Sequence, residues 1–249
     1  MATDIWNGLT WTPVPSRDTP RPRASVEGCL FFNREGAVGL GLVYPRELPR
    51  FSLDVVNNTF VVNTPLSIRF GARPSEAAAV RAAGKAGTIH LSGNVFVGRL
   101  GLIDHFAMRE WNVLPASEAV GLYPEAFDWR DSHNAYERGM PMVWARDQPD
   151  PTKPQRTIEG LADWHKFMGV RESTSVQGDV RFTGVSGMET DLDTLRPGQF
   201  RLAEGSVGKK AGPVGRDLGA DVDAVGPGAA YEAWKQTPDY QRWLKDMAR

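Results

Sequence analysis

The stretch Leu53–Val61, with the sequence LDVVNNTFV, aligns without a gap with Ile89–Val97, which reads IHLSGNVFV. In both stretches a segment that alternates apolar and polar residues meets an asparagine, and a phenylalanine follows two residues later. The alternation is typical of a strand with one buried and one exposed face. Asn58 and Asn94 occupy equivalent bends, 36 residues apart. Because such strand–turn–strand units cannot bury an apolar face alone, they predict a stack of repeats.

Short β-prone segments extend on both sides of this repeat, from Val26 to about Phe106, with turn residues between them. Gly71–Gly87 separates the two units and carries good helix formers behind Ser75, which accounts for the long period. The first 25 residues contain four prolines, which favour neither helix nor ladder. The repeat therefore predicts a stacked domain that follows an irregular lead-in.

The asparagine units resemble coils of right-handed parallel β-helix proteins of the pectin-lyase-like class. Three later segments resemble the closing pattern of such proteins: Ser175–Phe182 (SVQGDVRF), Gln199–Ser206 (QFRLAEGS) and Ala211–Asp221 (AGPVGRDLGAD). The tail from Val225 to Leu244 resembles the C-terminus of uncharacterised bacterial β-helix proteins, some of which are linked to protein-kinase domains. In this class an asparagine at the bend stacks on the asparagine of the next coil. The resemblance thus implies a structural ladder through Asn58 and Asn94.

Pattern and resemblance together predict an all-β fold: a short right-handed parallel β-helix with aromatic-rich loops and a C-terminal helical cap. We expect a proline-rich lead-in over 1–25, a β-helix-like domain with loop insertions over 26–224, and the cap over 225–249. The alternative is an antiparallel sandwich of the same short strands, which needs hairpin turns between neighbours. The gap-free alignment of the asparagine units favours the parallel stack.

Aromatic residues at helical spacings characterise the cap. They are Tyr231, Trp234, Tyr240 and Trp243. Thr237 suits the N-cap of a helix, and the proline after it suits the first helical position. We expect residues 229–247 to be helical and the aromatic side chains to cover the apolar cross-section and open strand edges of the last coil.

Composition and charge limit the partners and the compartment. The chain of 249 residues has 29 Lys and Arg against 30 Asp and Glu, so its formal net charge is −1. This balance gives no electrostatic footprint for nucleic acid. No apolar stretch is long enough for a membrane span, and the first residues lack the pattern of a secretory signal, which predicts a cytoplasmic location unless the chain is part of a longer exported protein. The lone Cys29 can form neither an internal disulfide nor a zinc site by itself.

Chemically competent residues are present but do not form a recognisable constellation. His90, His105, His133 and His165 show no metal-ligand or hydrolase spacing. Asp54 and His90 should face outwards from aligned strands, with Arg69 and Arg99 nearby, but one outward carboxylate is not the pair that a glycosidase uses. Asp217, Asp221 and Asp223 lack the spacing of a calcium loop. We therefore assign no catalytic residue, no metal and no cofactor.

The expected function is that of a non-catalytic interaction or surface module, either carbohydrate-contacting or serving as the C-terminal part of a larger protein. Its partners would be a polysaccharide or another protein. The alternative is a pectin-lyase-like carbohydrate-active enzyme, either a lyase or a glycoside hydrolase. That enzyme would need a cluster of carboxylates or arginines on one outer sheet.

Overall fold

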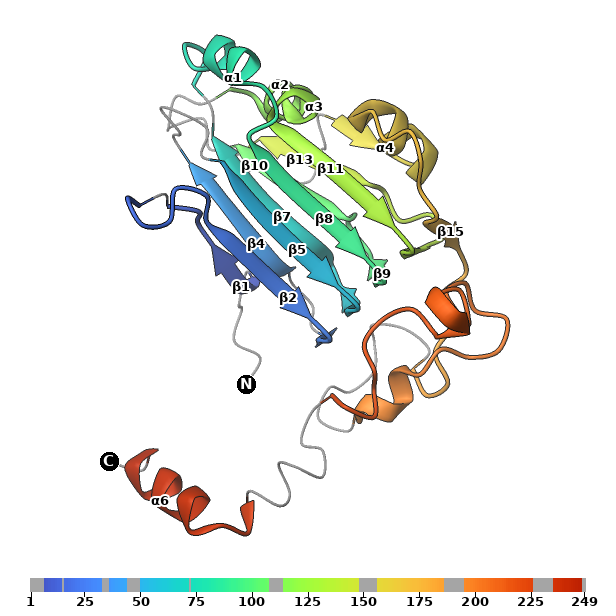
Figure 1. Cartoon of the computed structure of the whole chain (residues 1–249). Helices are drawn as coiled ribbons and strands as arrows, with labels where there is room; N and C mark the ends of the chain where they lie inside the picture. The colour runs from blue at the N-terminus through green and yellow to red at the C-terminus, as the bar shows by residue number, and fades with distance from the viewer. Residues whose placement is uncertain are drawn as a thin grey trace.

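The computed structural model describes residues 7–14, 16–32, 36–43, 50–71, 73–107, 114–147, 156–185, 195–225 and 235–247. Three sheets of parallel strands form its centre, and each is named here after one of its strands (Figure 1). The β5 sheet has the order β11-β8-β5-β2, with β2 Arg23–Glu27, β5 Phe51–Val56, β8 Gly87–Ser92 and β11 Phe127–Ser132. The β6 sheet has the order β15-β12-β9-β6-β3, with β3 Leu30–Phe32, β6 Thr59–Val62, β9 Val95–Gly98, β12 Ala135–Glu137 and β15 Val176–Gly178. The β7 sheet has the order β1-β4-β7-β10-β13-β14, with β1 Asn7–Trp11, β4 Gly36–Val43, β7 Thr64–Gly71, β10 Ile103–Ala107, β13 Val143–Asp147 and β14 Arg156–Ile158.

Strands that follow one another along most of the chain lie in different sheets. Through the central part of the stack, a strand pairs with the one three places further on: β2 with β5, β5 with β8, and β8 with β11. The register places Leu53 beside Ile89 and Phe60 beside Phe96, as the aligned sequences suggest. Among the described strands only β13 and β14 pair antiparallel, so the alternative of an antiparallel sandwich is wrong.

The predicted all-β fold is wrong, because the described chain has α/β content, about 20% helical and 36% strand. Its five α-helices are α1 Ala77–Ala83, α2 Ala116–Gly121, α3 Tyr123–Ala126, α4 Leu161–Met168 and α6 Pro238–Met247. The first four lie in connections between strands, where each buries an apolar stripe. In α4 the buried residues are Leu161, Trp164 and Met168, at the spacing of one helix face. The helix formers behind Ser75 indicated one of these helices, α1, but we expected such segments to be loop insertions in an all-β domain.

Aromatic rings stack through the core beneath the β6 sheet. Phe31, Phe60, Phe96 and Tyr136 come from successive strands, and neighbouring ring centroids lie 4.9–5.0 Å apart. The rings are almost parallel, with interplanar angles of 1°, 9° and 12°. Such stacking follows from the spacing of the strands, which holds equivalent residues about 4.8 Å apart.

The bend between the β5 and β6 sheets keeps one conformation in every repeat. Its first residue is Gly28, Asn57, Gly93 or His133, with φ of 63°, 53°, 70° and 52°. This left-handed region suits glycine and is tolerated by asparagine and histidine. A Cβ on Gly93 would lie 2.1 Å from Asn57 Oδ1, so close stacking requires glycine there.

Residues 179–185 and 195–224 of the C-terminal segment form a second layer over the outer face of the β6 sheet. Val61 of β6 packs in a cluster with Val185, Phe200 and Val222. A second cluster contains Val95 of β9 with Ala135, Leu202 and Leu218. Short 3₁₀ turns, Pro197–Phe200 and Pro213–Gly215, lie within this layer. The segments that resemble a solenoid ending thus cover one side of a sheet.

The two ends of the chain differ from a simple lead-in and cap. β1 and the start of β2 lie within residues 1–25, which were expected to be irregular. In α6, Tyr240 N donates to Thr237 Oγ1 at 3.4 Å, and this helix stands apart from the sheets in Figure 1. Tyr231, Trp234 and the side chain of Trp243 lie outside the described residues, so their burial stays a prediction.

Candidate functional site

The asparagine side chains at the bend form a continuous line of buried hydrogen bonds. Asn58 Nδ2 donates to Asn94 Oδ1 at 3.1 Å, and Asn94 Nδ2 donates to Asn134 Oδ1 at 2.9 Å. All three side chains are fully buried. At one end Cys29 N donates to Asn58 Oδ1 at 2.8 Å, and at the other Asn134 N donates to Ser175 Oγ at 3.0 Å. The three asparagine side chains are buried within this line, so the hydrogen bonds between them hold neighbouring repeats together.

Asn134 is a third member of this line, beyond the predicted ladder of Asn58 and Asn94. Its signal was present, because Asn134 precedes Tyr136 by two residues just as Asn94 precedes Phe96. The interval changes from 36 to 40 residues, since α2 and α3 lie in the intervening connection. A search with a fixed period therefore does not find it.

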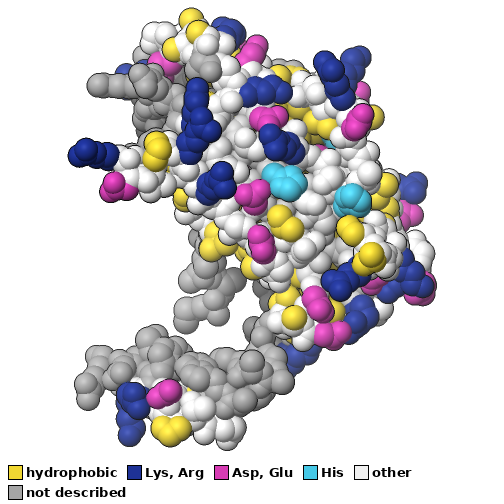
Figure 2. Space-filling model, in the orientation of Figure 1, with side chains coloured by type: hydrophobic (Ala, Val, Ile, Leu, Met, Phe, Trp, Pro, Cys, Tyr) yellow, Lys and Arg dark blue, Asp and Glu magenta, His cyan; other side chains and the backbone are white. Residues whose placement is uncertain are grey.

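The outer face of the β5 sheet is lined by polar side chains. Its outward positions are Arg23, Ser25 and Glu27 on β2; Ser52, Asp54 and Val56 on β5; Thr88, His90 and Ser92 on β8; and Asp128, Arg130 and Ser132 on β11. Each position except Val56 is polar and partly or fully exposed. Figure 2 shows basic, acidic and histidine side chains spread over this face. We call it the polar face.

Charged side chains on the polar face are paired across and along the strands. His90 Nδ1 lies 3.1 Å from Asp54 Oδ1, and the two side chains are 36% and 37% exposed. Arg130 donates to Asp128 Oδ2 from Nε at 2.9 Å and from Nη2 at 2.8 Å. The contact through Nδ1 leaves His90 Nε2 for a bound molecule. The structure thus brings Asp54 and His90 together, as their aligned positions suggested.

The two arginines expected near this pair do not complete it. Arg99 follows β9 and lines a cavity at the β6 sheet. The side chain of Arg69 lies outside the described residues. Among the described residues, the arginine beside the Asp54–His90 pair is Arg130, which lies next to His90 on β11. Its guanidinium group already binds Asp128.

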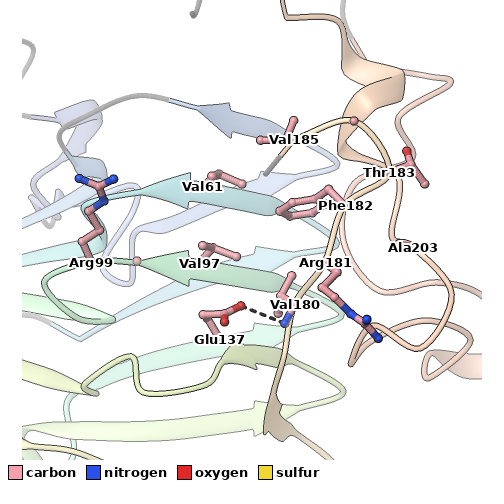
Figure 3. A pocket seen from close by; sticks show the side chains of 12 residues that line it. Val61, Val97, Arg99, Glu137, Val180, Arg181, Phe182, Thr183, Val185 and Ala203 are labelled. Carbon is pink, nitrogen blue, oxygen red and sulfur yellow. Dashed lines mark hydrogen bonds between the residues drawn. The ribbon is translucent and has the colours of Figure 1, made fainter. Parts of the chain in front are cut away.

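A cavity of about 730 Å³ separates the β6 sheet from the C-terminal layer (Figure 3). Its apolar lining comes from Val61 and Val97 on the strands and from Phe182 and Val185 on the segment opposite. Such a volume is within the usual range of small-molecule sites, about 300–1,000 Å³. The cavity was not predicted from the sequence, because its two walls come from segments that are far apart in the chain.

Glu137 is the carboxylate in this cavity, and its pKa is raised. Partial burial is the main cause, and the charge of Asp179 adds to it. Val180 N donates to Glu137 Oε2 at 2.9 Å, which works in the opposite direction, as does Arg138. Arg138 is itself paired with Asp179 at 2.7 Å. Glu137 is therefore a partly desolvated acid held in place by the layer that covers it.

A buried carboxylate, Asp131, gathers the polar groups at the edge of the stack near α4. His165 Nε2 lies 2.5 Å from Asp131 Oδ2, and Ser175 Oγ and Tyr136 OH donate to Oδ1 at 2.6 and 3.1 Å. Burial and then the charge of Asp131 raise the pKa of Tyr136. Ser175 and His165 both form hydrogen bonds with Asp131 and not with each other. A nucleophile and its general base would instead be hydrogen-bonded to one another. This cluster is structural.

The remaining candidates from the sequence have structural contacts. His105 is buried and lies 2.7 Å from Tyr123 OH. The guanidinium of Arg201 holds the pKa of Asp223 below its usual value, and Lys209 binds Asp217 at 2.8 Å. In the described part of the chain, no group of three His, Cys, Asp or Glu side chains could hold a metal ion.

The chain has no significant match among protein-family models, curated proteins or solved structures. The resemblance to pectin-lyase-like proteins therefore stays a prediction. None of the described helices is both long and apolar enough to cross a bilayer.

Proposed function

We propose that this chain is a non-catalytic binding module that contacts a carbohydrate through the polar face. The observation that supports this is the array of partly or fully exposed polar side chains on four paired strands, from Arg23 on β2 to Ser132 on β11, in which Val56 is the one apolar outward position. Sugar hydroxyls both donate and accept hydrogen bonds. Carboxylates, hydroxyls, an imidazole and guanidinium groups side by side satisfy both needs.

The geometry of the sheet suits an extended glycan that runs across the strands. The register places Ser25, Asp54, His90 and Arg130 in one row, on neighbouring strands. Neighbouring strands are about 4.8 Å apart, so the row repeats its polar groups at intervals close to the length of a pyranose ring. A flat surface of this kind contacts several sugar units weakly rather than one unit tightly.

The charges of the polar face favour an uncharged glycan. Two basic side chains, Arg23 and Arg130, share the polar face with three acidic ones: Glu27, Asp54 and Asp128. The net charge of the face is therefore slightly negative when His90 is neutral. A polyuronate would meet this negative charge unfavourably. We therefore expect neutral oligosaccharides to bind more tightly than oligogalacturonate at the same chain length.

Titration calorimetry with hexasaccharides of neutral glucans, xylan and mannan, and with oligogalacturonate, tests this proposal. The double variant Asp54→Ala/His90→Ala should weaken binding about tenfold, because it removes two hydrogen-bonding groups from the centre of the row. Glu118→Ala, an exposed carboxylate on α2, is the matched control and should bind as the wild type does. The proposal is wrong if no neutral glycan binds, or if both variants lose affinity equally.

The second candidate is a carbohydrate-active enzyme, and one observation favours it. Asp54 contacts His90 through Nδ1, which is how a carboxylate orients a histidine that acts as a base through Nε2. A glycosidase also needs a second carboxyl group across the scissile bond, and a lyase needs a cation at the uronate. We expect purified protein to release neither reducing ends nor unsaturated ends. Release that His90→Ala abolishes would establish the enzyme instead.

A further inference from the structure

β2 is the end strand of the β5 sheet, and its outer edge carries backbone groups that the ladder with β5 does not use (Figure 1). One of them, Glu27 O, accepts a hydrogen bond from Cys29 Sγ at 3.2 Å. Ser52 N donates to Pro22 O and Gly28 N donates to Val56 O, each at 3.1 Å. Residues that bond to one neighbour alternate along a parallel strand, so the even-numbered residues of β2 face β5. Arg23, Ser25 and Glu27 therefore direct their N–H and C=O groups towards the open edge.

The sequence of β2, RASVE, is complementary to itself in the antiparallel direction. If a second copy of β2 is aligned about Ser25, Arg23 faces Glu27 of the second copy and Glu27 faces its Arg23. These side chains lie on the outer face, where opposite charges on directly opposed residues stabilise a sheet. On the inner face Ala24 meets Val26, so the apolar side is matched as well.

The hydrogen bonds agree with this register. In an antiparallel pair centred on Ser25, the directly hydrogen-bonded positions are Ser25 with Ser25 and Arg23 with Glu27. These are the residues whose backbone groups are left over from the ladder with β5. One alignment thus satisfies the backbone, the charges and the apolar side together.

The other two sheets expose apolar side chains at the same end. Phe31 on β3 is the last ring of the aromatic stack and is only partly buried, as are its neighbours Leu30 and Phe32. Leu9 on β1 is 48% exposed. A partner at this end would therefore bury apolar surface in addition to forming the strand pair.

We propose that two copies of this chain form a two-fold symmetric dimer in which β2 pairs antiparallel with β2 of the second copy about Ser25. The contact is self-complementary, as a two-fold axis requires, and it closes an edge that would otherwise template uncontrolled pairing. The dimer joins two polar faces into one continuous sheet. The dimer does not depend on carbohydrate binding, so each can fail without the other.

Sedimentation velocity of the full chain over a range of concentrations tests the dimer. Ser25→Pro removes an N–H that β5 does not use, and an edge strand accepts proline at such a position. We expect Ser25→Pro to sediment as a folded monomer under conditions where the wild type is dimeric. Ser25→Ala keeps the N–H and should remain dimeric. Circular dichroism and thermal unfolding of each variant check that the fold is retained.

Charge reversal tests the register. Arg23→Glu alone and Glu27→Arg alone each place like charges opposite one another twice, which should raise the dissociation constant about tenfold. The double variant Arg23→Glu/Glu27→Arg restores both pairs and should recover the wild-type constant. A wild type that is monomeric at all concentrations, a Ser25→Pro variant as dimeric as the wild type, or a double variant no tighter than the single ones would each overturn the proposal.

Discussion

The β5 and β6 sheets are built from the same repeats, but the outer face of the β5 sheet is polar and open to solvent, whereas that of the β6 sheet is apolar and covered. Outward positions of the β5 sheet hold Asp54, His90 and other polar side chains, and they are open to solvent. Outward positions of the β6 sheet hold Val61 and Val95, which are 1% and 0% exposed beneath the C-terminal layer. Strand pairing is the same in both sheets, so the outward side chains alone distinguish a surface that is open to solvent from one that is covered.

The difference also explains where the cavity lies. A covering layer made of irregular segments does not fill every space above a sheet as a second sheet would. The space between Val97 and Phe182 is such a gap, and the carboxyl group of Glu137 lies in it. The polar face has no layer and hence no comparable enclosure.

Placing a charge on each face gives the largest contrast. Val61→Asp should lower the free energy of unfolding by about 3–5 kcal/mol, because it buries an unpaired carboxylate beneath the C-terminal layer. Val56→Asp, at an outward and half-buried position of the β5 sheet, should cost less than about 1 kcal/mol. Urea unfolding of both variants measures the difference. Equal losses would mean that the two faces are not distinct.

The bend where the two sheets meet gives the next effect. Asn58→Ala removes the acceptor of Cys29 N–H and the donors to Val26 O and Asn94 Oδ1. Buried groups left without partners should lower the free energy of unfolding by about 1–3 kcal/mol. Thr88→Ala on the polar face is a control of similar size, and a comparable loss there would contradict the structural role of the ladder.

Glu137 beneath the layer should make stability depend on pH. Its pKa is raised above 4.5 in the folded state, so the folded protein binds this proton more tightly than the unfolded chain does. The stabilisation is complete below the unfolded value and is lost as pH rises through the folded value. The melting temperature of Glu137→Gln minus that of the wild type should therefore be larger at pH 7 than at pH 4.

The groups facing Glu137 carry both signs of charge, which is why its variant needs a control. They are Arg138, which follows Glu137 directly after β12, Asp179 and Arg181 on the covering segment, and Arg99 after β9. Asp179→Asn should reduce the same pH dependence only in part, because the charge of Asp179 is the smaller cause. A wild type and a Glu137→Gln variant with identical pH profiles would show that Glu137 titrates normally.

On the polar face the smallest change is expected. The Asp54–His90 pair is more than one-third exposed, and exposed pairs contribute about 0–1 kcal/mol. Asp54→Ala should therefore lower the free energy of unfolding by less than about 1 kcal/mol while it weakens glycan binding. A loss of stability as large as that of Asn58→Ala would show that the polar face supports the fold.

The stacking of repeats could be predicted from the sequence, as could helical segments behind Ser75 and at the C-terminus, but α2 and α3 could not. Alternation around Asn58 and Asn94 predicts paired strands, and the register Leu53 with Ile89 follows from the alignment. These two helices could not be predicted from periodicity, because α2 and α3 are too short to show a helical repeat of apolar residues. The expectation of an all-β chain failed there.

The candidate sites divide in the same manner. Asp54 and His90 could be placed together because one repeat separates them, and their contact is local to two neighbouring strands. Glu137 and Phe182 could not, because the covering layer comes from a distant part of the chain and no periodic pattern links it to β6 and β9. Long-range packing of irregular segments leaves no local signal in a sequence.

The two-residue bend that begins with Gly28, Asn57, Gly93 or His133 has a consequence for how this chain can change in length. Added residues are tolerated where a connection already varies, such as those that hold α1 or α2. One residue inserted at the bend would instead turn the side chains of the β6-sheet strand that follows it to the other face of the sheet. The connections that hold helices can therefore accept insertions, whereas the bend between the β5 and β6 sheets must keep its length in every repeat.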